Sequence, residues 1–180
     1  MSERFDELLP EHATFISKQK VFFVGSAARD GRVNVSPKGQ DSLRVLGPRR
    51  ILWLNLTGSG NETATHLLDC NRITLMWCAF QGPPLILRAY GSARVVHPDD
   101  AGWAECSAAI PAPVGARQFF DVSIDLVQTS CGYAVPLLEY QEDRRALTLW
   151  AEKRGTDGIA EYWRENNQLS LDGRPTDLAG

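Results

Sequence analysis

The sequence has no long apolar run and no excess of basic residues. Its hydrophobic stretches fall well short of the ~20 residues that a membrane-spanning helix needs. Lysine and arginine together number 19, against 22 aspartates and glutamates, which gives a formal net charge of -3. Proteins that bind nucleic acids usually carry a basic patch or stripe. We therefore expect neither a membrane nor a nucleic acid as a partner.

Cysteine is scarce, and the start of the chain has no targeting pattern. Residues 1–9 contain three acidic side chains and lack the basic and then apolar order of a secretory signal, so we expect a cytoplasmic protein. No cysteines form a CxxC pair, and the three histidines do not stand at metal-finger spacing. We expect no metal site and four reduced, structural thiols, namely Cys70, Cys78, Cys106 and Cys131.

The sequence does contain a series of short strand-like runs separated by turn residues. Asp30-Gly31 stands between two such runs, which is a strong hairpin signal. Gly91 lies inside a longer run and indicates a bulge or a barrel corner. The expected strands cover residues 20–28, 32–36, 43–46, 51–56, 72–80, 85–96 and 120–126, and the expected helices cover residues 5–17, 62–69, 103–109, 142–154 and 156–167.

Consecutive hairpins favour an antiparallel barrel or sandwich over a parallel sheet. We predict an α+β, mainly β fold in which six or seven antiparallel strands form a barrel with peripheral helices. The chain of 180 residues is long enough for one domain with a sizeable core. We therefore expect a single domain over residues 1–180, with the barrel at about 18–130 and a C-terminal helical extension at about 140–170.

One loop carries the clearest sign of a binding site. It leaves a buried strand, turns on glycines and enters a helix, so that free N–H groups at the helix start favour an anion. Glycines allow the backbone to approach a ligand closely, and the polar side chains offer hydrogen bonds. A solvent loop with a helix cap remains an alternative. The candidate residues are Asn55, Thr57, Gly58, Ser59, Gly60, Asn61 and Thr63.

A second candidate lies on the strand after the Asp-Gly turn. Asn34 and Ser36 share one face of this strand, and Lys38 follows them. Such side chains suit the carbonyl and nitrogen edge of a flavin, and Lys38 or Arg32 could supply charge to its ring or phosphate. A solvated polar face with a surface lysine is the alternative.

The order of these features resembles the pyridoxamine 5'-phosphate oxidase family of FMN-binding split β-barrels. The resemblance covers about residues 15–99. In that family an Arg…Lys-Gly strand and a Thr-Asn…Ser-Arg-Lys loop hold FMN between two subunits. Arg32 and Lys38 match the first motif with one extra residue between them, and Asn55 and Ser59 match part of the second.

The resemblance implies a homodimer with FMN at the subunit interface. It also assigns to the flavin Gln128, from the opposite subunit, and Trp150, although plain packing roles stay open for both. Gly60-Asn61 replaces the family's Arg-Lys, so Lys38, backbone N–H groups or other arginines must balance the phosphate charge. The C-terminal residues that hold the substrate phosphate in the oxidase have no clear match, which implies a different substrate.

Two functions are compatible with these features. The first is an FMN-dependent oxidoreductase of unknown substrate, in which the flavin carries the hydride chemistry and the protein orients it. No acid–base pair stands out, so no catalytic residue is assigned. The alternative is a non-enzymatic split barrel that binds a flavin, a deazaflavin or haem as a carrier or sensor.

Overall fold

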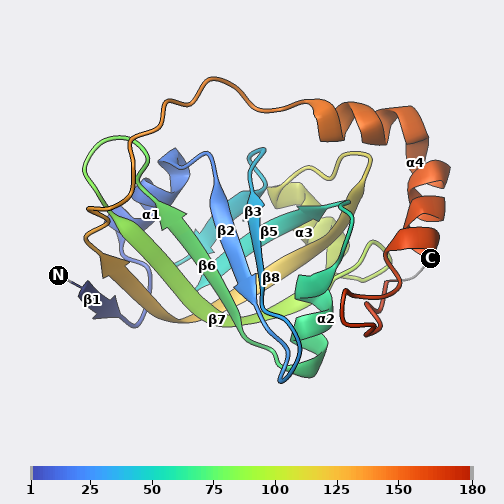
Figure 1. Ribbon diagram of the computed structural model, residues 1–180, viewed down its shortest axis with the longest axis horizontal. Helices are drawn as coiled ribbons and strands as arrows, with labels where there is room; N and C mark the ends of the chain where they lie inside the picture. Colours follow the sequence, from blue (N-terminus) through green and yellow to red (C-terminus); the bar gives the residue numbers. More distant parts are fainter. Residues whose placement is uncertain (1, 179–180) are drawn as a thin grey trace.

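Eight strands form one antiparallel sheet in the computed structural model, which describes residues 2–178 (Figure 1). The α+β, mainly β class is confirmed, with one strand more than the six or seven expected. The strands are β1 (Ser2–Phe5), β2 (Phe22–Ser26), β3 (Asn34–Lys38), β4 (Leu43–Gly47), β5 (Arg50–Leu56), β6 (Ile73–Cys78), β7 (Ile86–Val96) and β8 (Ala116–Ser130), and the helices are α1 (Pro10–Lys18), α2 (Glu62–Asp69), α3 (Trp103–Ala109) and α4 (Ala146–Asn166).

The additional strand lies at the N-terminus, where the pattern predicted a helix from residue 5. Pro10 occupies the first turn of α1, where its missing N–H costs no hydrogen bond, so the helix begins there. Residues before it instead pair as β1 with the end of β8. The C-terminal helices were predicted to break near residue 155, and α4 is indeed kinked at Gly155, whose φ is 66°.

The sheet curls into a barrel that stays open along one seam. Its strand order is β3-β2-β6-β7-β8-β5-β4, so β3 and β4 are the two ends of the path and do not pair with each other. One edge of the long strand β8 pairs with β7, and the other pairs with β5 and then with β1. This is a split barrel, with the split between β3 and the β4–β5 hairpin.

Aromatic side chains fill the barrel across this split. Trp53 of β5 stacks on Phe120 of β8 with ring centroids 4.5 Å apart, and Phe22 of β2 meets both Trp53 and Trp77 of β6 at 6.1 Å. All four rings are buried. Burying each is worth about 1.5–3 kcal/mol, so this cluster joins β2 and β5 across the split, where the strands do not pair with each other.

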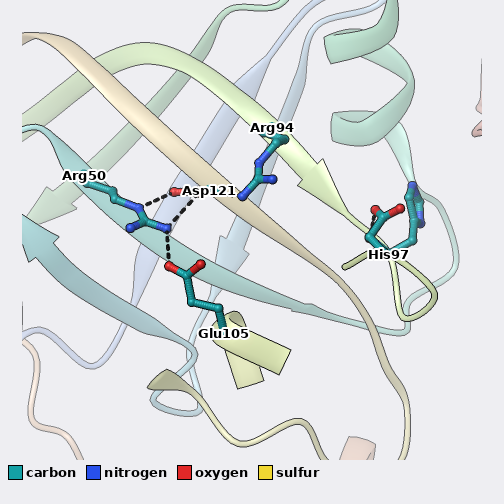
Figure 2. Close-up of polar contacts among 6 residues, drawn as sticks. Arg50, Arg94, His97, Glu105 and Asp121 are labelled. Carbon is teal, nitrogen blue, oxygen red and sulfur yellow. Dashed lines mark hydrogen bonds and ion pairs between the residues drawn. The ribbon is translucent and has the colours of Figure 1, made fainter. Parts of the chain in front are cut away.

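Strand β5 is buried on both faces because helix α3 covers its outer side. Leu52 and Leu54 point out of the barrel and pack in a second cluster with Cys106 and Ile110 from α3 and its end. An ion-pair network ties the helix to the sheet beside this cluster, as Figure 2 shows: Arg50 of β5 contacts both Glu105 of α3, at 3.1 Å, and Asp121 of β8, at 2.9 Å.

Gly91 confirms the predicted bulge. The β7–β8 register shifts between Tyr90 and Gly91, and a side chain at Gly91 would overlap the backbone oxygen of Ser123 on β8. The position therefore needs glycine because the neighbouring strand approaches too closely for any Cβ.

No helix within residues 2–178 is long and apolar enough to cross a bilayer. The cytoplasmic location stays a prediction.

Candidate functional site

A cavity of about 500 Å³ lies in the split of the barrel, between β3, the end of β5 and the start of α2. It gathers side chains that are far apart in the sequence. Nine of the predicted site residues line it: Asn34, Ser36, Lys38, Asn55, Gly58, Ser59, Gly60, Asn61 and Thr63. The remaining lining residues are Leu56, Glu62, Arg117, Leu169, Ser170 and Leu171.

Strand β3 forms one wall of the cavity, because every second side chain of the strand points into it. Asn34, Ser36 and Lys38 face the cavity, while Val33 and Val35 point outward and are 72% and 65% exposed. The Lys38 ammonium reaches across the split and lies 5.1 Å from the ring centroid of Trp53. The predicted polar face of this strand therefore lines the cavity and is not a solvated surface.

Two backbone oxygens of the glycine loop accept hydrogen bonds from side chains, and the adjoining N–H groups point away from those side chains. Asn167 Nδ2 donates to the oxygen of Gly58 at 3.0 Å, and Arg117 Nη2 donates to the oxygen of Gly60 at 3.0 Å. The C=O and N–H of one peptide plane point in opposite directions, so the N–H groups of Ser59 and Asn61 face away from these donors. Neither donates to another described residue, which leaves both for a ligand.

Arg117 is a site residue that the sequence pattern did not reveal. It is the second residue of strand β8, its side chain is buried at 2% exposure, and it lines the cavity. Its Nη1 donates to Asn167 Oδ1 at 2.8 Å, and its buried Nε has no hydrogen-bond partner. It forms no ion pair with any residue between 2 and 178. The sequence offers one weak indication of its role, namely an arginine just before the alternating run of residues 120–126.

Two cations therefore share the cavity, the half-buried Lys38 and the buried Arg117. Burial lowers the pKa of Arg117 to about 10. Burial, followed by repulsion from Arg117, lowers the pKa of Lys38 to about 8. The cavity also holds the Glu62 carboxylate, which accepts a hydrogen bond from the N–H of Leu171 at 3.0 Å. Two positive groups against one negative group leave a surplus of positive charge, so an anion in this cavity would be stabilised.

A network of buried amides fixes the floor of the cavity. Gln118 is fully buried and exchanges hydrogen bonds of 2.8 and 3.2 Å with Asn61, and Asn55 Nδ2 donates weakly to Asn61 Oδ1 at 3.4 Å. On the α2 side, Asn34 Nδ2 lies 3.4 Å from Thr63 Oγ1. These bonds hold the polar groups in place before any ligand arrives.

Four of the predicted residues lie outside this cavity. Arg32 is exposed and pairs with Asp172, and Thr57 is buried, where it donates to the oxygen of Gly115 and accepts from Trp163 Nε1. Gln128 bonds to Tyr90 at the other end of β8, and Trp150 packs against Tyr162. Hydrogen bonds within the chain use the polar groups of Arg32, Thr57 and Gln128, whereas Trp150 makes a ring contact. The contact of Trp150 with a flavin, and that of Gln128 with a flavin of the opposite subunit, stay predictions.

The C-terminal segment supplies the last part of the lining. After α4 the chain turns back in a short hairpin, with Leu169 bridged to Pro175, and lies beside α2 (Figure 1). Leu169, Ser170 and Leu171 thereby reach the cavity. No sequence pattern predicted this hairpin, because it has too few residues to show a period.

Residues 8–131 match the pyridoxamine 5'-phosphate oxidase family. The family protein ustO of Aspergillus flavus is 37% identical over 177 residues, which cover 88% of this chain and 71% of that protein. Among solved structures, a pyridoxamine 5'-phosphate oxidase-like protein of Lactobacillus delbrueckii superposes with a TM-score of 0.53 at 20% identity, covering 68% of this chain and 94% of the other. HupZ from Group A Streptococcus also gives 0.53, at 14% identity, covering 66% of this chain and 92% of the other. The chain therefore belongs to the pyridoxamine 5'-phosphate oxidase family.

Proposed function

We propose that the protein binds FMN in the cavity between β3 and β5 and acts as an FMN-dependent oxidoreductase. The observation that carries the proposal is the pair of cations, half-buried Lys38 and buried Arg117, beside a loop with free N–H groups. A phosphomonoester brings two negative charges and several acceptor oxygens, which match these groups. Membership of the family supports the choice of a flavin.

The remaining lining suits the polar part of a flavin. Asn34, Ser36 and Asn55 offer amides and a hydroxyl for hydrogen bonds to ribityl oxygens and to ring carbonyls. When bound, the flavin supplies two-electron redox chemistry, while this chain holds and orients it. The substrate stays open, and we propose that it is not pyridoxamine phosphate.

We also propose a homodimer with the cavity at its interface. Apolar side chains are exposed beside the cavity. Leu169 and Leu171 of the hairpin line it, whereas Val35 lies on the outer face of β3 and Val33 just before that strand; all four are 59–73% exposed. A second copy related by a twofold axis would bury these side chains and cover the flavin ring.

Haem has less support than a flavin in this cavity. Haem iron is held by His, Cys, Met or Tyr side chains, and none of the described residues that line the cavity is of these types. A flavin carrier without catalytic activity differs from an enzyme only in its reactivity, so experiment must separate them.

The first test is the ligand and its reactivity. Purified protein should show a flavin absorbance band near about 450 nm, and mass spectrometry of the denatured protein should detect FMN. Anaerobic bleaching by NADH or NADPH, followed by recovery with an acceptor, supports an enzyme, whereas FMN that binds but never turns over supports a carrier. A colourless protein that also fails to bind added FMN contradicts the proposal.

The second test addresses Arg117. Replacing it with methionine keeps the length of the side chain but removes the charge. Because hydrogen bonds to charged groups are worth about 1.5–3 kcal/mol, Arg117→Met should weaken FMN binding by roughly 10- to 100-fold. Riboflavin, which lacks the phosphate, should bind equally well to both proteins in fluorescence titrations. Equal loss of both ligands would place the phosphate elsewhere.

A further inference from the structure

The C-terminal extension reaches the cavity although it lies outside the part of the chain that matches the family, residues 8–131. Figure 1 shows the chain leaving β8, arching over one end of the barrel and returning through α4 to the side that carries α2. Near its end, α4 contacts the glycine loop: Trp163 Nε1 donates to Thr57 Oγ1 at 2.8 Å. The extension is thus attached to the loop that forms one wall of the site.

Asn167, the residue after α4, makes the central contact. Its side chain is fully buried, and both ends of its amide are used. Nδ2 donates to the oxygen of Gly58, and Oδ1 accepts from Arg117 Nη1. Its own N–H donates to the oxygen of Trp163 at 3.0 Å, and its oxygen accepts from Thr176. These bonds leave the amide a single orientation.

The Asn167 amide is uncharged, so it does not neutralise the Arg117 guanidinium that it contacts. An arginine this deeply buried usually has a carboxylate partner, which would neutralise it. Here two uncharged oxygens, Oδ1 of Asn167 and the oxygen of Gly60, hold the guanidinium. They fix its position without using its charge, which therefore remains available to an anion in the cavity.

We propose that Asn167 is a positioning residue that holds the Arg117 guanidinium and the glycine loop for the phosphate of the cofactor. The positive charge then comes from Arg117 of β8, and the extension contributes the neutral amide that orients it. The inference rests on the proposed function, because it assigns Asn167 to the phosphate end of the FMN site. A purely structural role, in which Asn167 only closes the end of α4, makes a different prediction.

The test compares Asn167→Asp with a matched control, Asn166→Asp. Asn166 is exposed and donates to the oxygen of Tyr162, so its replacement introduces the same charge one residue away and also removes one hydrogen bond. An aspartate at 167 keeps the contact with Arg117 but neutralises it. N167D should lower the ratio of FMN affinity to riboflavin affinity by at least about tenfold, and N166D should leave it unchanged.

Inorganic phosphate serves as a second probe, since it requires only the cationic end of the cavity. Phosphate should raise the thermal unfolding temperature of the wild type and of N166D but not that of N167D. A folded N167D with an unchanged FMN-to-riboflavin ratio would overturn the inference and leave Asn167 a structural role. A wild type that binds phosphate but no flavin would instead overturn the proposed function alone.

A variant without a buried charge guards against misfolding. Asn167→Ser is too short to reach Arg117 and adds no carboxylate. If N167D does not fold, as judged by circular dichroism, N167S should still lower FMN affinity while riboflavin affinity is kept. Equal affinities in N167S and the wild type would contradict the positioning role.

Discussion

At the scale of single residues, the site depends on charge that the protein buries without neutralising it. Lys38 and Arg117 each lose hydration, and neither gains a carboxylate within the described chain. This arrangement destabilises the empty protein, because burial disfavours the charged form of each group. An anion that enters the cavity would interact favourably with both cations and offset this cost, which is the reason for proposing a phosphate there.

The lowered pKa of Lys38 predicts how cofactor binding depends on pH. The empty protein holds Lys38 with a pKa of about 8, and a phosphate beside it would raise that value. Binding therefore takes up a proton above pH 8, and FMN affinity should fall as the pH rises through about 8. Fluorescence titrations between about pH 6.5 and 9.5 measure this.

The variant Lys38→Met supplies the control for this pH dependence. It should bind FMN more weakly at pH 7, and its affinity should be flat across the same range. The folding stability of the empty wild-type protein should depend on pH in the opposite direction to FMN affinity. The unfolded chain holds the proton up to a pKa of 10.5, so stability should rise between about pH 8 and 10.5, and it should not do so in K38M. A wild-type affinity that is level through pH 8 would exclude Lys38 from the phosphate site.

At the scale of elements, the ion-pair network in Figure 2 attaches α3 to the outer face of the barrel. Asp121 is its centre, with a side chain only 13% exposed that pairs with both Arg50 and Arg94. Burial opposes ionisation of this carboxyl, but hydrogen bonds from the two arginines outweigh burial and lower its pKa. Glu105, at 68% exposure, is a peripheral member.

This difference in exposure predicts unequal costs for two similar substitutions. Asp121→Asn removes charged hydrogen bonds to two arginines and should lower the free energy of unfolding by about 1–3 kcal/mol. Glu105→Gln breaks one exposed pair and should cost about 0.5 kcal/mol or less. Urea denaturation of both variants measures the difference, and equal costs would contradict the central position of Asp121.

The contribution of Asp121 should also depend on pH. Its folded pKa lies below the ordinary value of 3.8, so its stabilising effect is complete above that value. It is then lost as the pH falls through the folded pKa. The gap in stability between the wild type and D121N should therefore close at strongly acidic pH.

At the scale of the whole molecule, the exposed apolar side chains beside the cavity predict that two chains assemble around it. Val35 lies on the outer face of edge strand β3, away from the cavity lining, and is 65% exposed. Val35→Asp would place a charge in the proposed interface, so this variant should be a monomer that retains less FMN than the proposed wild-type dimer. Sedimentation velocity and flavin content measure both effects.

Leu149 provides the control for this substitution. It is also exposed, at 52%, but lies on α4 and not at the cavity mouth. Leu149→Asp should leave the association state and the flavin content unchanged. A wild-type protein that sediments as a monomer while retaining its flavin would contradict the shared site.

Much of the fold could be predicted because its signals are local. The alternation over residues 120–126, the Asp-Gly turn and the glycine inside β7 each depend on residues within a few positions of one another. The α2 bounds were predicted to the residue, because a glycine loop begins the helix and Asn71 follows its end. The β1 strand was missed, because its only pairing partner is β8, more than a hundred residues away.

The sequence by itself determined the strand pattern, the family and most of the cavity lining, since β3 and the glycine loop each bring their polar groups as a local set. Only the tertiary structure decided which cations line the cavity. Arg117 and Asn167 are 50 positions apart and meet because α4 folds back over the barrel. It also decided that Arg32 and Thr57 are used within the chain, since a side chain's partners depend on what packs beside it and not on its own sequence neighbours.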